Sequence, residues 1–397
     1  MNRRIFHAAD LYLPQTDPQK WSVVACDQFT SQPEYWQAAA EVAGDAPSAL
    51  HVVLPEVYLG QNEEGRIADI NATMHEYLQN GVLKEYKNAM IYVQRQTVDG
   101  LRRGLVGVID LAAYDYHAGA DSLIRATEQT VLERIPPRVR IRRDAALELP
   151  HVLLLIDDPD GTVIEPLDGC DGLQTAYEFD LMLDGGHIKG SFLDEQAQQQ
   201  VLNALDKLQQ TCRGLLFAVG DGNHSLATAK ECAALNDFPA AQQALVELVN
   251  IHDPSLIFEP IYRVIFDADT EALLDALQRE LGAEQGEAAQ TVTAVTADGQ
   301  RTLRLRAAQK LTVGTLQSWL DAYLKQHPAL RIDYIHGEEV VRELCKQKNT
   351  VGFLFEGMKK EELFEAVRCD GALPRKTFSM GHAKDKRYYM EARRIRG

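Results

Sequence analysis

Short apolar runs separated by polar, turn-forming segments dominate the first two-thirds of the chain. Runs rich in Val, Leu and Ile predict strands at 21–26, 50–54, 90–97, 103–110, 151–156 and 215–219. Apolar positions three and four residues apart predict helices at 32–42, 67–80, 123–133, 195–212 and 226–235. Pro136-Pro137 is expected to stop the helix at 123–133, and Asp99-Gly100 predicts a hairpin turn between two of the strands.

From about residue 260 the same kinds of element alternate in a second region. The pattern predicts strands at 261–266, 291–296, 302–306 and 350–355. It predicts helices at 270–281, 313–326, 338–347 and 360–367. This alternation is typical of an α/β or α+β protein, and we expect two portions, 1–258 and 259–397.

Charge and cysteine spacing exclude several classes of protein. The 397 residues include 58 acidic and 41 basic side chains, for a formal net charge of −17. This surface repels nucleic acid and anionic lipid, so we expect neither as a partner. No apolar run approaches the roughly 20 residues that span a bilayer, and no signal-peptide core begins the chain, which predicts a cytoplasmic protein. The six scattered cysteines form no C-x-x-C pair, so no zinc site is expected.

The most unusual stretch is the break after the strand at 215–219. Residues 220–225 read Gly-Asp-Gly-Asn-His-Ser and lead directly into the helix at 226–235. Gly220 and Gly222 permit backbone angles that other residues avoid and let a ligand approach the main chain. Ser225 or Asn223 is expected to cap the helix. Free N–H groups at a helix start bind anions, and phosphate is the usual guest.

The side chains of this turn add reactive groups to the anion site. His224 and Asn223 can donate hydrogen bonds to phosphate oxygens, and Asp221 can hold Mg²⁺ or accept a proton. The alternative is an ordinary tight turn in which Asp221 and Asn223 satisfy backbone groups. An acid, an amide and an imidazole within four residues favour the functional interpretation. The turn matches neither a Walker loop nor a dinucleotide fingerprint.

Residues 220–225 resemble the Asp-Gly-His-His-Arg signature of bacterial proteins grouped as domain of unknown function 1015. Three further stretches agree with that family in order. They are Thr-Glu-Gln-Thr at 127–130, the block at 250–256 followed by Pro-Ile-Tyr-Arg at 260–263, and Leu-Pro-Arg-Lys-Thr-Phe at 373–378. The resemblance extends over nearly the whole chain.

The family core is in turn similar to the ParB/sulfiredoxin-like nucleotide-binding fold, which includes free-serine kinases. The resemblance implies a ParB/sulfiredoxin-like N-terminal portion with insertions, plus a C-terminal α/β lobe. It also implies that Glu128 is a base beside the substrate hydroxyl. Asp221, Gly222 and His224 would hold nucleotide phosphates and Mg²⁺.

Two positions depart from the family signature. Asn223 replaces its first histidine, which keeps a donor but loses a titratable group. Ser225 replaces its arginine, which removes a fixed positive charge that phosphoryl transfer would use. Sulfiredoxin chemistry needs a cysteine in this turn, so that activity is excluded.

Other cations can replace the missing arginine. Arg134 and Arg138 belong to the strongest basic run in the chain and follow Glu128 closely, although a solvated basic segment is an equally good explanation. Arg125 is expected one helical turn before Glu128, where a purely structural ion pair is the alternative to a role in the substrate cleft. Lys376 can reach a phosphate or belong to a solvated tail.

Asp27 is a further candidate for the substrate cleft. It leaves a predicted strand in a polar cluster, and capping of the next helix is the alternative explanation.

The leading hypothesis is a phosphotransferase that uses Mg²⁺ and ATP or ADP and acts on a small hydroxylated metabolite, with free serine as the first candidate. Asp221 would position the metal, His224 and the helix start would neutralise charge, and Glu128 would take the hydroxyl proton. A nucleotide-binding switch without phosphoryl transfer and a phosphate-ester hydrolase are the alternatives. The sequence leaves the oligomeric state open, a homodimer included.

Overall fold

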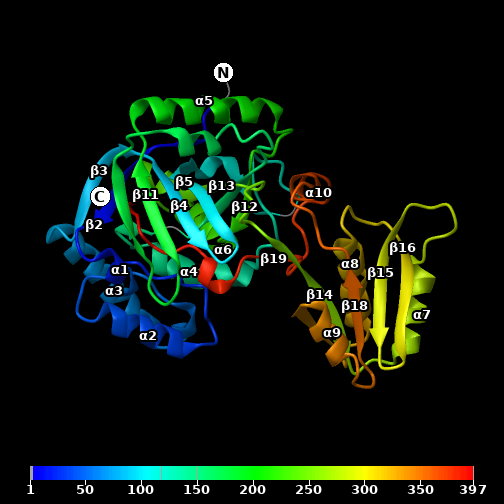
Figure 1. Cartoon of the computed structure of the whole chain (residues 1–397). Coiled ribbons are helices and arrows are strands. Elements are labelled where there is room, and N and C mark those ends of the chain that lie inside the picture. The colour runs from blue at the N-terminus through cyan, green and yellow to red at the C-terminus, as the bar shows by residue number, and fades with distance from the viewer. Residues whose placement is uncertain (1–2, 118, 150, 397) are drawn as a thin grey trace. The chain divides into compact units, whose positions relative to one another are not determined.

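The chain folds into two compact units of mixed α/β structure, which confirms the predicted fold class (Figure 1). The computed structural model describes residues 3–117, 119–149 and 151–396. The first unit comprises Met1–Ala126, Thr130–Leu256 and Gly381–Gly397, and the second comprises Thr127–Gln129 and Ile257–Met380. The change of unit after Leu256 lies close to the expected boundary. The tail from residue 381, expected in the C-terminal portion, belongs instead to the first unit.

The main sheet of the first unit has the order β10-β11-β4-β5-β13-β9-β12-β7-β6, with β1 paired to β5. Its strands are Thr175–Asp180 (β10), His187–Phe192 (β11), Ile91–Thr97 (β4), Gly100–Asp110 (β5), Gln243–Asn250 (β13), Leu153–Ile156 (β9), Phe217–Asp221 (β12), Ile124–Ala126 (β7), Tyr114–Asp115 (β6) and Phe6–His7 (β1). β12 runs antiparallel to β9 and parallel to β7. The predicted hairpin at Asp99-Gly100 is confirmed as β4–β5.

A second sheet explains why the tail joins the first unit. Its order is β3-β2-β20-β8, with strands Leu83–Ala89 (β3), Ala9–Pro14 (β2), Ala392–Arg394 (β20) and Leu147–Glu148 (β8). Arg387, from the tail, forms buried ion pairs with Glu247 and Glu391. The tail therefore supplies a strand and a buried charge cluster. Its basic composition predicts a solvated segment instead, and that prediction is wrong.

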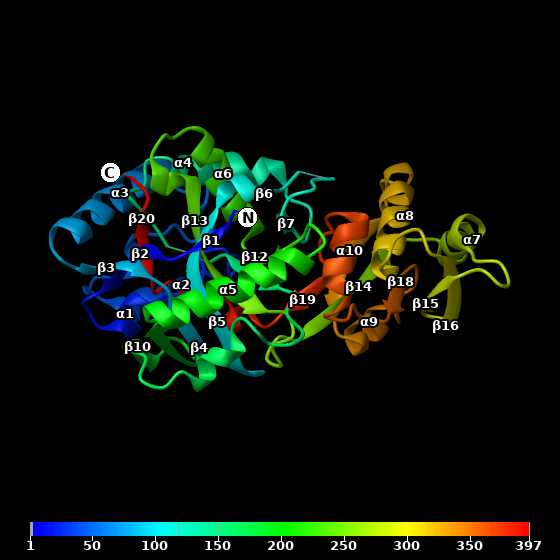
Figure 2. The same ribbon diagram turned by 90° about the horizontal axis from the view of Figure 1, so that it is seen from above.

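Helices pack on both sheets of the first unit. They are Pro18–Trp21 (α1), Pro33–Ala43 (α2), Glu63–Gln79 (α3), Ile135–Arg142 (α4), Glu195–Thr211 (α5) and Asn223–Ala234 (α6). α5 lies across the main sheet in Figure 2 and buries Ala197, Val201 and Leu205. Asp194 caps it by accepting the Ala197 N–H at 2.7 Å. Short 3-10 turns occur at Ala49–His51, Glu56–Tyr58, Leu111–Ala113, Leu132–Arg134, Glu165–Gly169, Pro239–Gln242 and Ala383–Asp385.

Three predicted elements of the first unit are wrong. Residues 21–26 end a short helix and then make one isolated bridge, and 50–54 contain a 3-10 turn rather than a strand. The helix predicted at 123–133 is instead the strand β7 followed by extended chain. Ile124–Ala126 is buried beside β12, so strand pairing overrides the helical spacing. Pro136-Pro137 begins α4, in a first turn where a missing N–H costs nothing.

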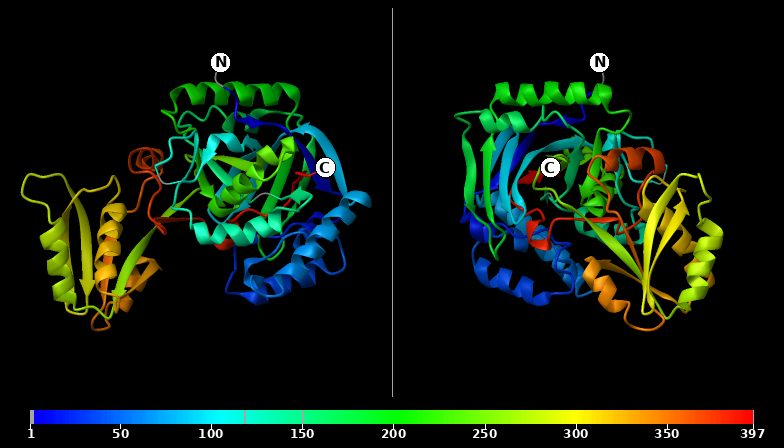
Figure 3. Two further views of the ribbon diagram at one scale, coloured as in Figure 1. Left: turned by 180° about the vertical axis from the view of Figure 1, so that it is seen from behind. Right: turned by 45° about the vertical axis from the view of Figure 1, so that its right-hand side comes forward.

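The second unit is a sheet of order β16-β15-β18-β14-β17, with β19 paired to β14. Its strands are Gly299–Arg306 (β16), Ala289–Thr296 (β15), Val351–Phe355 (β18), Phe258–Phe266 (β14), Arg331–His336 (β17) and Phe378–Met380 (β19). Its helices, seen from two sides in Figure 3, are Thr270–Leu281 (α7), Thr312–Gln326 (α8), Glu338–Leu344 (α9) and Glu362–Asp370 (α10). Among the described residues, no helix has the length and apolar character needed to cross a membrane.

Candidate functional site

The turn after β12 has the shape that its two glycines predict. Gly222 has φ +82°, in the left-handed region, and is the N-cap of α6. A Cβ at Gly222 would lie 3.0 Å from the Val152 Cα, and one at Gly220 would lie 2.9 Å from the Leu155 Cγ. Gly222 is therefore required by backbone conformation and by space, whereas Gly220 is required by space alone.

The start of α6 carries no side-chain cap, so the expected caps Ser225 and Asn223 are wrong. The helix begins three residues earlier than expected, at Asn223, and its first backbone bond runs from the Leu226 N–H to the Gly222 carbonyl. The N–H groups of 223–225 consequently have no partner within the helix. The Asn223 Oδ1 atom is buried without a hydrogen-bond partner. The turn therefore presents backbone donors of the kind that bind anions.

Asp221 is held by the turn and by the C-terminal tail. Its Oδ1 accepts the Gly222 N–H at 2.9 Å, and its Oδ2 lies 3.1 Å from the Lys386 Nζ. In the part of the chain that the structure describes, the side chains gathered closely enough to hold a metal are Asp99, His382 and Asp385. Asp221 is paired with Lys386, and its role as a Mg²⁺ ligand stays a prediction. It fits an ion only as one carboxylate beside phosphates that bring the metal.

His224 is uncharged, which differs from the expected charge-neutralising role. Its Nε2 accepts the Val131 N–H at 3.2 Å, so the ring proton lies on Nδ1. Burial and the nearby Arg138 and Arg134 lower the pKa of His224 to about 4. At neutral pH His224 can therefore donate one hydrogen bond through Nδ1 but adds no positive charge to the turn.

Ser225, the position where the family signature has arginine, belongs to a chain of polar contacts. Its Oγ lies 2.7 Å from His151 Nε2, and His151 Nδ1 lies 2.8 Å from the Tyr389 hydroxyl. His151 is 7% exposed and Tyr389 is 1% exposed. The Tyr389 hydroxyl also accepts the Cys26 N–H at 3.1 Å. Three side chains from distant parts of the sequence are thus aligned behind the turn.

Asp27 lies beside the same histidine. Its Oδ2 is 3.8 Å from His151 Nε2. Burial acts to raise the pKa of Asp27, but His151 and then Lys386 are among the groups that hold it below its usual value. The structure therefore brings a charged Asp27 together with the 220–225 turn.

The predicted arginines have different environments. Arg138 pairs with Glu56 and donates to the Arg134 carbonyl at 2.7 Å, while the Arg134 side chain is exposed. Both lie close enough to His224 to lower its pKa. Arg125 lies on strand β7 and donates to the Asp121 carboxylate at 2.7 Å, so its expected helical pairing with Glu128 is wrong.

Glu128 and Lys376 belong to the second unit. Residues 127–129 run beside Leu373, whose N–H donates to the Thr127 carbonyl at 2.8 Å. Burial raises the pKa of Glu128 despite opposing backbone N–H donation from Lys376 and Thr377. A raised pKa suits a general base working near neutral pH. The assigned role of Glu128 stays a prediction.

A cavity of about 150 Å³ opens beside the polar chain in the first unit and is lined by His151, Ser225, Tyr389 and Cys26. Its apolar lining includes Val52, Leu54, Met74, Leu147, Leu226 and Leu245. The charged side chains on its wall are paired, Glu56 with Arg138 and Glu148 with Arg142. The Ser225–His151 contact is consequently open to a small molecule.

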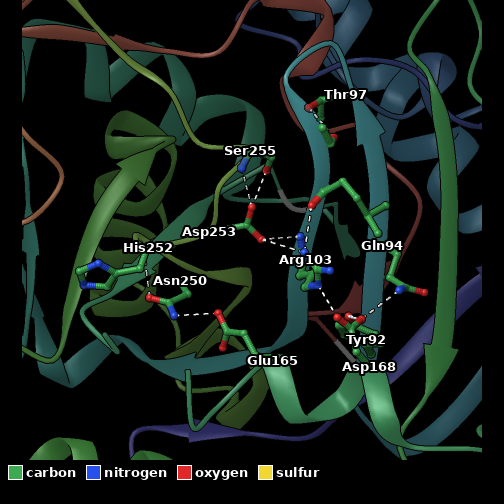
Figure 4. A network of polar contacts seen from close by, with 12 residues as sticks. Tyr92, Gln94, Thr97, Arg103, Glu165, Asp168, Asn250, His252, Asp253 and Ser255 are labelled. Atoms are coloured by element: carbon green, nitrogen blue, oxygen red, sulfur yellow. Dashed lines mark hydrogen bonds and ion pairs between the residues drawn. The ribbon is translucent and has the colours of Figure 1, made fainter. Parts of the chain in front are cut away.

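The block at 250–256, which carried part of the family resemblance, forms a separate polar network (Figure 4). Asp253 accepts the Ser255 N–H at 2.8 Å and the Arg103 N–H at 3.2 Å, and Arg103 Nε donates to Asp168 at 2.6 Å. Asn250 donates to Glu165 at 2.8 Å. These bonds hold in place the segment that follows β13 at the end of the first unit. The polar residues of 250–256 therefore have a structural role.

Sequence reasoning missed His151, Lys386 and Tyr389. His151 precedes an apolar strand, and the other two lie in a tail whose basic composition resembles a solvated segment. The run Lys-Arg-Tyr-Tyr at 386–389 was the available signal, since two adjacent aromatic residues are unusual in a solvated tail.

Comparison with known proteins gives a family and several distant structures. The model of a family described as "Protein of unknown function (DUF1015)" matches residues 8–323, which confirms the family resemblance, while the stretch at 373–378 lies beyond the match. No curated protein matches the chain. A free serine kinase in complex with AMP matches with a TM-score of 0.40 and 11% identity, over 71% of this chain and 90% of the other.

Two other solved structures are similarly distant. A conserved hypothetical protein from Pyrococcus furiosus has a TM-score of 0.35 and 12% identity, over 69% of this chain and 89% of its own. SbnI with a C-terminal truncation, from Staphylococcus aureus, has a TM-score of 0.36 and 11% identity, over 69% and 82%. Scores of this size leave the function to be argued from the site.

Proposed function

We propose, for a chain that belongs to the DUF1015 family of proteins of unknown function, that the 220–225 turn binds the phosphates of a nucleotide. The observation that carries this proposal is the start of α6. It begins at a left-handed glycine, has no side-chain cap and lies beside the Lys386 ammonium. Backbone N–H groups and a positive charge at one helix start are the features that bind phosphate.

The surrounding charges support a polyanionic ligand. Lys386 has one contact with Asp221 and can direct its remaining protons to phosphate oxygens. Arg134, whose side chain is exposed, places a further positive charge near His224, and Arg138 beside it is paired with Glu56. In a chain of net charge −17, this concentration of basic groups favours a ligand with several negative charges, such as a nucleotide.

We further propose that the chain transfers a phosphoryl group from this nucleotide to the hydroxyl of a small metabolite, with free serine as the first candidate. The turn would hold the phosphates through the N–H groups of 223–225 and the His224 Nδ1–H. Lys386 would balance charge on the transferred group. Mg²⁺, when it accompanies the nucleotide, would supply further neutralisation. Glu128 is the base that the family resemblance assigns.

The test is ³¹P NMR of the full chain with Mg²⁺, ATP or ADP, and a pool of hydroxylated metabolites that includes L-serine. We expect a new phosphomonoester resonance that is lost in Lys386→Met. Ser318→Ala, at an exposed helix position of the second unit, serves as the control and should keep the resonance. If no phosphomonoester forms with any metabolite in the pool, the phosphotransferase proposal is wrong.

A further inference from the structure

We infer that Ser225 is itself a phosphoryl acceptor, activated by His151, so that transfer proceeds through a phosphoserine on this chain. The geometry points to this because the two groups are 2.7 Å apart and a third side chain, Tyr389, orients the imidazole from the other nitrogen at 2.8 Å. A nucleophile, a base within hydrogen-bond reach and a group that holds the base are the recurring parts of covalent catalysis. The inference rests on the proposed binding of a nucleotide at the same turn.

The Tyr389 hydroxyl can hold His151 in the tautomer that activates serine. In that tautomer Nδ1–H donates to the tyrosine oxygen, and Nε2 accepts the Ser225 proton. Tyr389 keeps its proton because burial raises its pKa well above the usual value, and it also contacts the Cys26 thiol. The tyrosine can therefore donate a hydrogen bond to the Cys26 sulfur while its oxygen accepts one from His151.

Asp27 supplies the counter-charge that this step requires. When His151 takes the serine proton it becomes an imidazolium ion in a buried site, which is costly without a nearby negative charge. The Asp27 carboxylate lies 3.8 Å from Nε2, and although burial acts to raise the pKa of Asp27, a positive charge on His151 lowers it. The negative charge of Asp27 stabilises the protonated state of His151. The uncharged His224 cannot supply such a counter-charge.

The placement of Ser225 on α6 suits attack on a bound phosphate. Ser225 is the third residue of the helix, so it belongs to the first turn, whose free N–H groups would hold the terminal phosphate. The family signature has an arginine here, and replacing it with serine exchanges a fixed charge for a nucleophile. Serine at position 225 therefore weakens direct transfer to the acceptor but makes transfer through a phosphoserine possible.

The covalent step balances as follows. The Ser225 Oγ–P bond forms and the bond between the terminal phosphorus and the bridging oxygen of the nucleoside triphosphate breaks. The nucleoside diphosphate leaves, and the serine proton moves to His151 Nε2. In the second half, the acceptor hydroxyl gives its proton to Glu128, the proposed general base, and its oxygen attacks the phosphoserine phosphorus. The Ser225 Oγ–P bond breaks, and His151 returns its proton to the Ser225 oxygen.

The experiment incubates the full chain with Mg²⁺ and ATP, without an acceptor, and follows phosphorylation by intact mass and by tandem mass spectrometry of peptides. We expect one phosphoryl group on Ser225 and none in Ser225→Ala. His151→Gln should slow the modification about a hundredfold, since a general base contributes at least that factor. Ser318→Ala, the control, should be modified at Ser225 like the wild type. Calorimetric titration with ADP accompanies each variant.

The outcomes separate the two proposals. If the wild type binds ADP but carries no phosphate on Ser225, the covalent route is wrong while the nucleotide site stands. Modification at the wild-type rate in His151→Gln would also overturn the inference, because that result would show that His151 is not the base. If ADP does not bind, the proposed function fails, and this inference fails with it.

Discussion

Protonation of His224 should destabilise the folded chain in mild acid. Burial, Arg138 and Arg134 lower its pKa from a reference value of 6.5 to about 4. A group with a depressed pKa in the folded state binds its proton more readily when unfolded. Its contribution to stability is complete above pH 6.5 and is lost as the pH falls through about 4. At 1.36 kcal/mol per pKa unit the complete effect is about 3 kcal/mol.

The folded-state and reference pKa values of His224 determine how much stability is lost over a pH range that can be measured. Between pH 7 and pH 5 the linkage relation predicts a loss of about 2 kcal/mol from this residue. His224→Gln keeps an acceptor for the Val131 N–H but does not titrate. Urea unfolding of both proteins at the two pH values isolates the effect, because all other groups titrate in both.

We expect the free energy of unfolding of the wild type to fall by about 2 kcal/mol more than that of His224→Gln on acidification. Equal pH dependence of the two proteins would refute the burial and charge environment assigned to His224.

Three further substitutions test other parts of the structure. Glu128→Gln should abolish phosphoryl transfer in the ³¹P NMR assay yet leave ADP affinity unchanged, and a variant as active as the wild type would remove Glu128 as base. Gly222→Ala should lower the free energy of unfolding in urea by about 1–2 kcal/mol, since the alanine would be forced into the left-handed region; an unchanged value would contradict the turn geometry. Arg387→Met leaves Glu247 and Glu391 buried without their partner, so thermal and urea unfolding should show a loss of about 3–5 kcal/mol. A loss below 1 kcal/mol would show that these pairs are not buried.

Local chemistry made much of the fold predictable. The strand, glycine turn and helix at 217–234 follow from residues that are neighbours in the sequence, and the same holds for the β4–β5 hairpin. Amphipathic spacing predicted α5, α7 and α8 because each of these helices buries one face. In these elements propensity and packing agree.

Elements whose character depends on distant partners were not predictable. The apolar pattern does not indicate β13, because Glu247 interrupts it, and that charge is tolerated only through its buried pair with Arg387. The region 123–133 has helical spacing, but Ile124–Ala126 pairs with β12. Both outcomes depend on tertiary contacts that no local window contains.

The candidate site shows the same division. The turn and Asp27 could be proposed from sequence because glycines and polar clusters mark loop ends. His151, Lys386 and Tyr389 reach the turn only when β9, β12 and the returning tail are assembled. Their roles therefore depend on the second sheet of the first unit, which no local sequence pattern predicts.

Calorimetric titration of the full chain with ADP tests the central claim, that the 220–225 turn binds nucleotide phosphates. The comparison is between Lys386→Met and its matched control Lys384→Met, whose exposed ammonium pairs with Asp184 instead. A hydrogen bond to a charged group is worth about 1.5–3 kcal/mol, so Lys386→Met should weaken binding by about tenfold or more. Lys384→Met should bind like the wild type. Equal affinities in the two variants, or no binding by the wild type, would contradict the account.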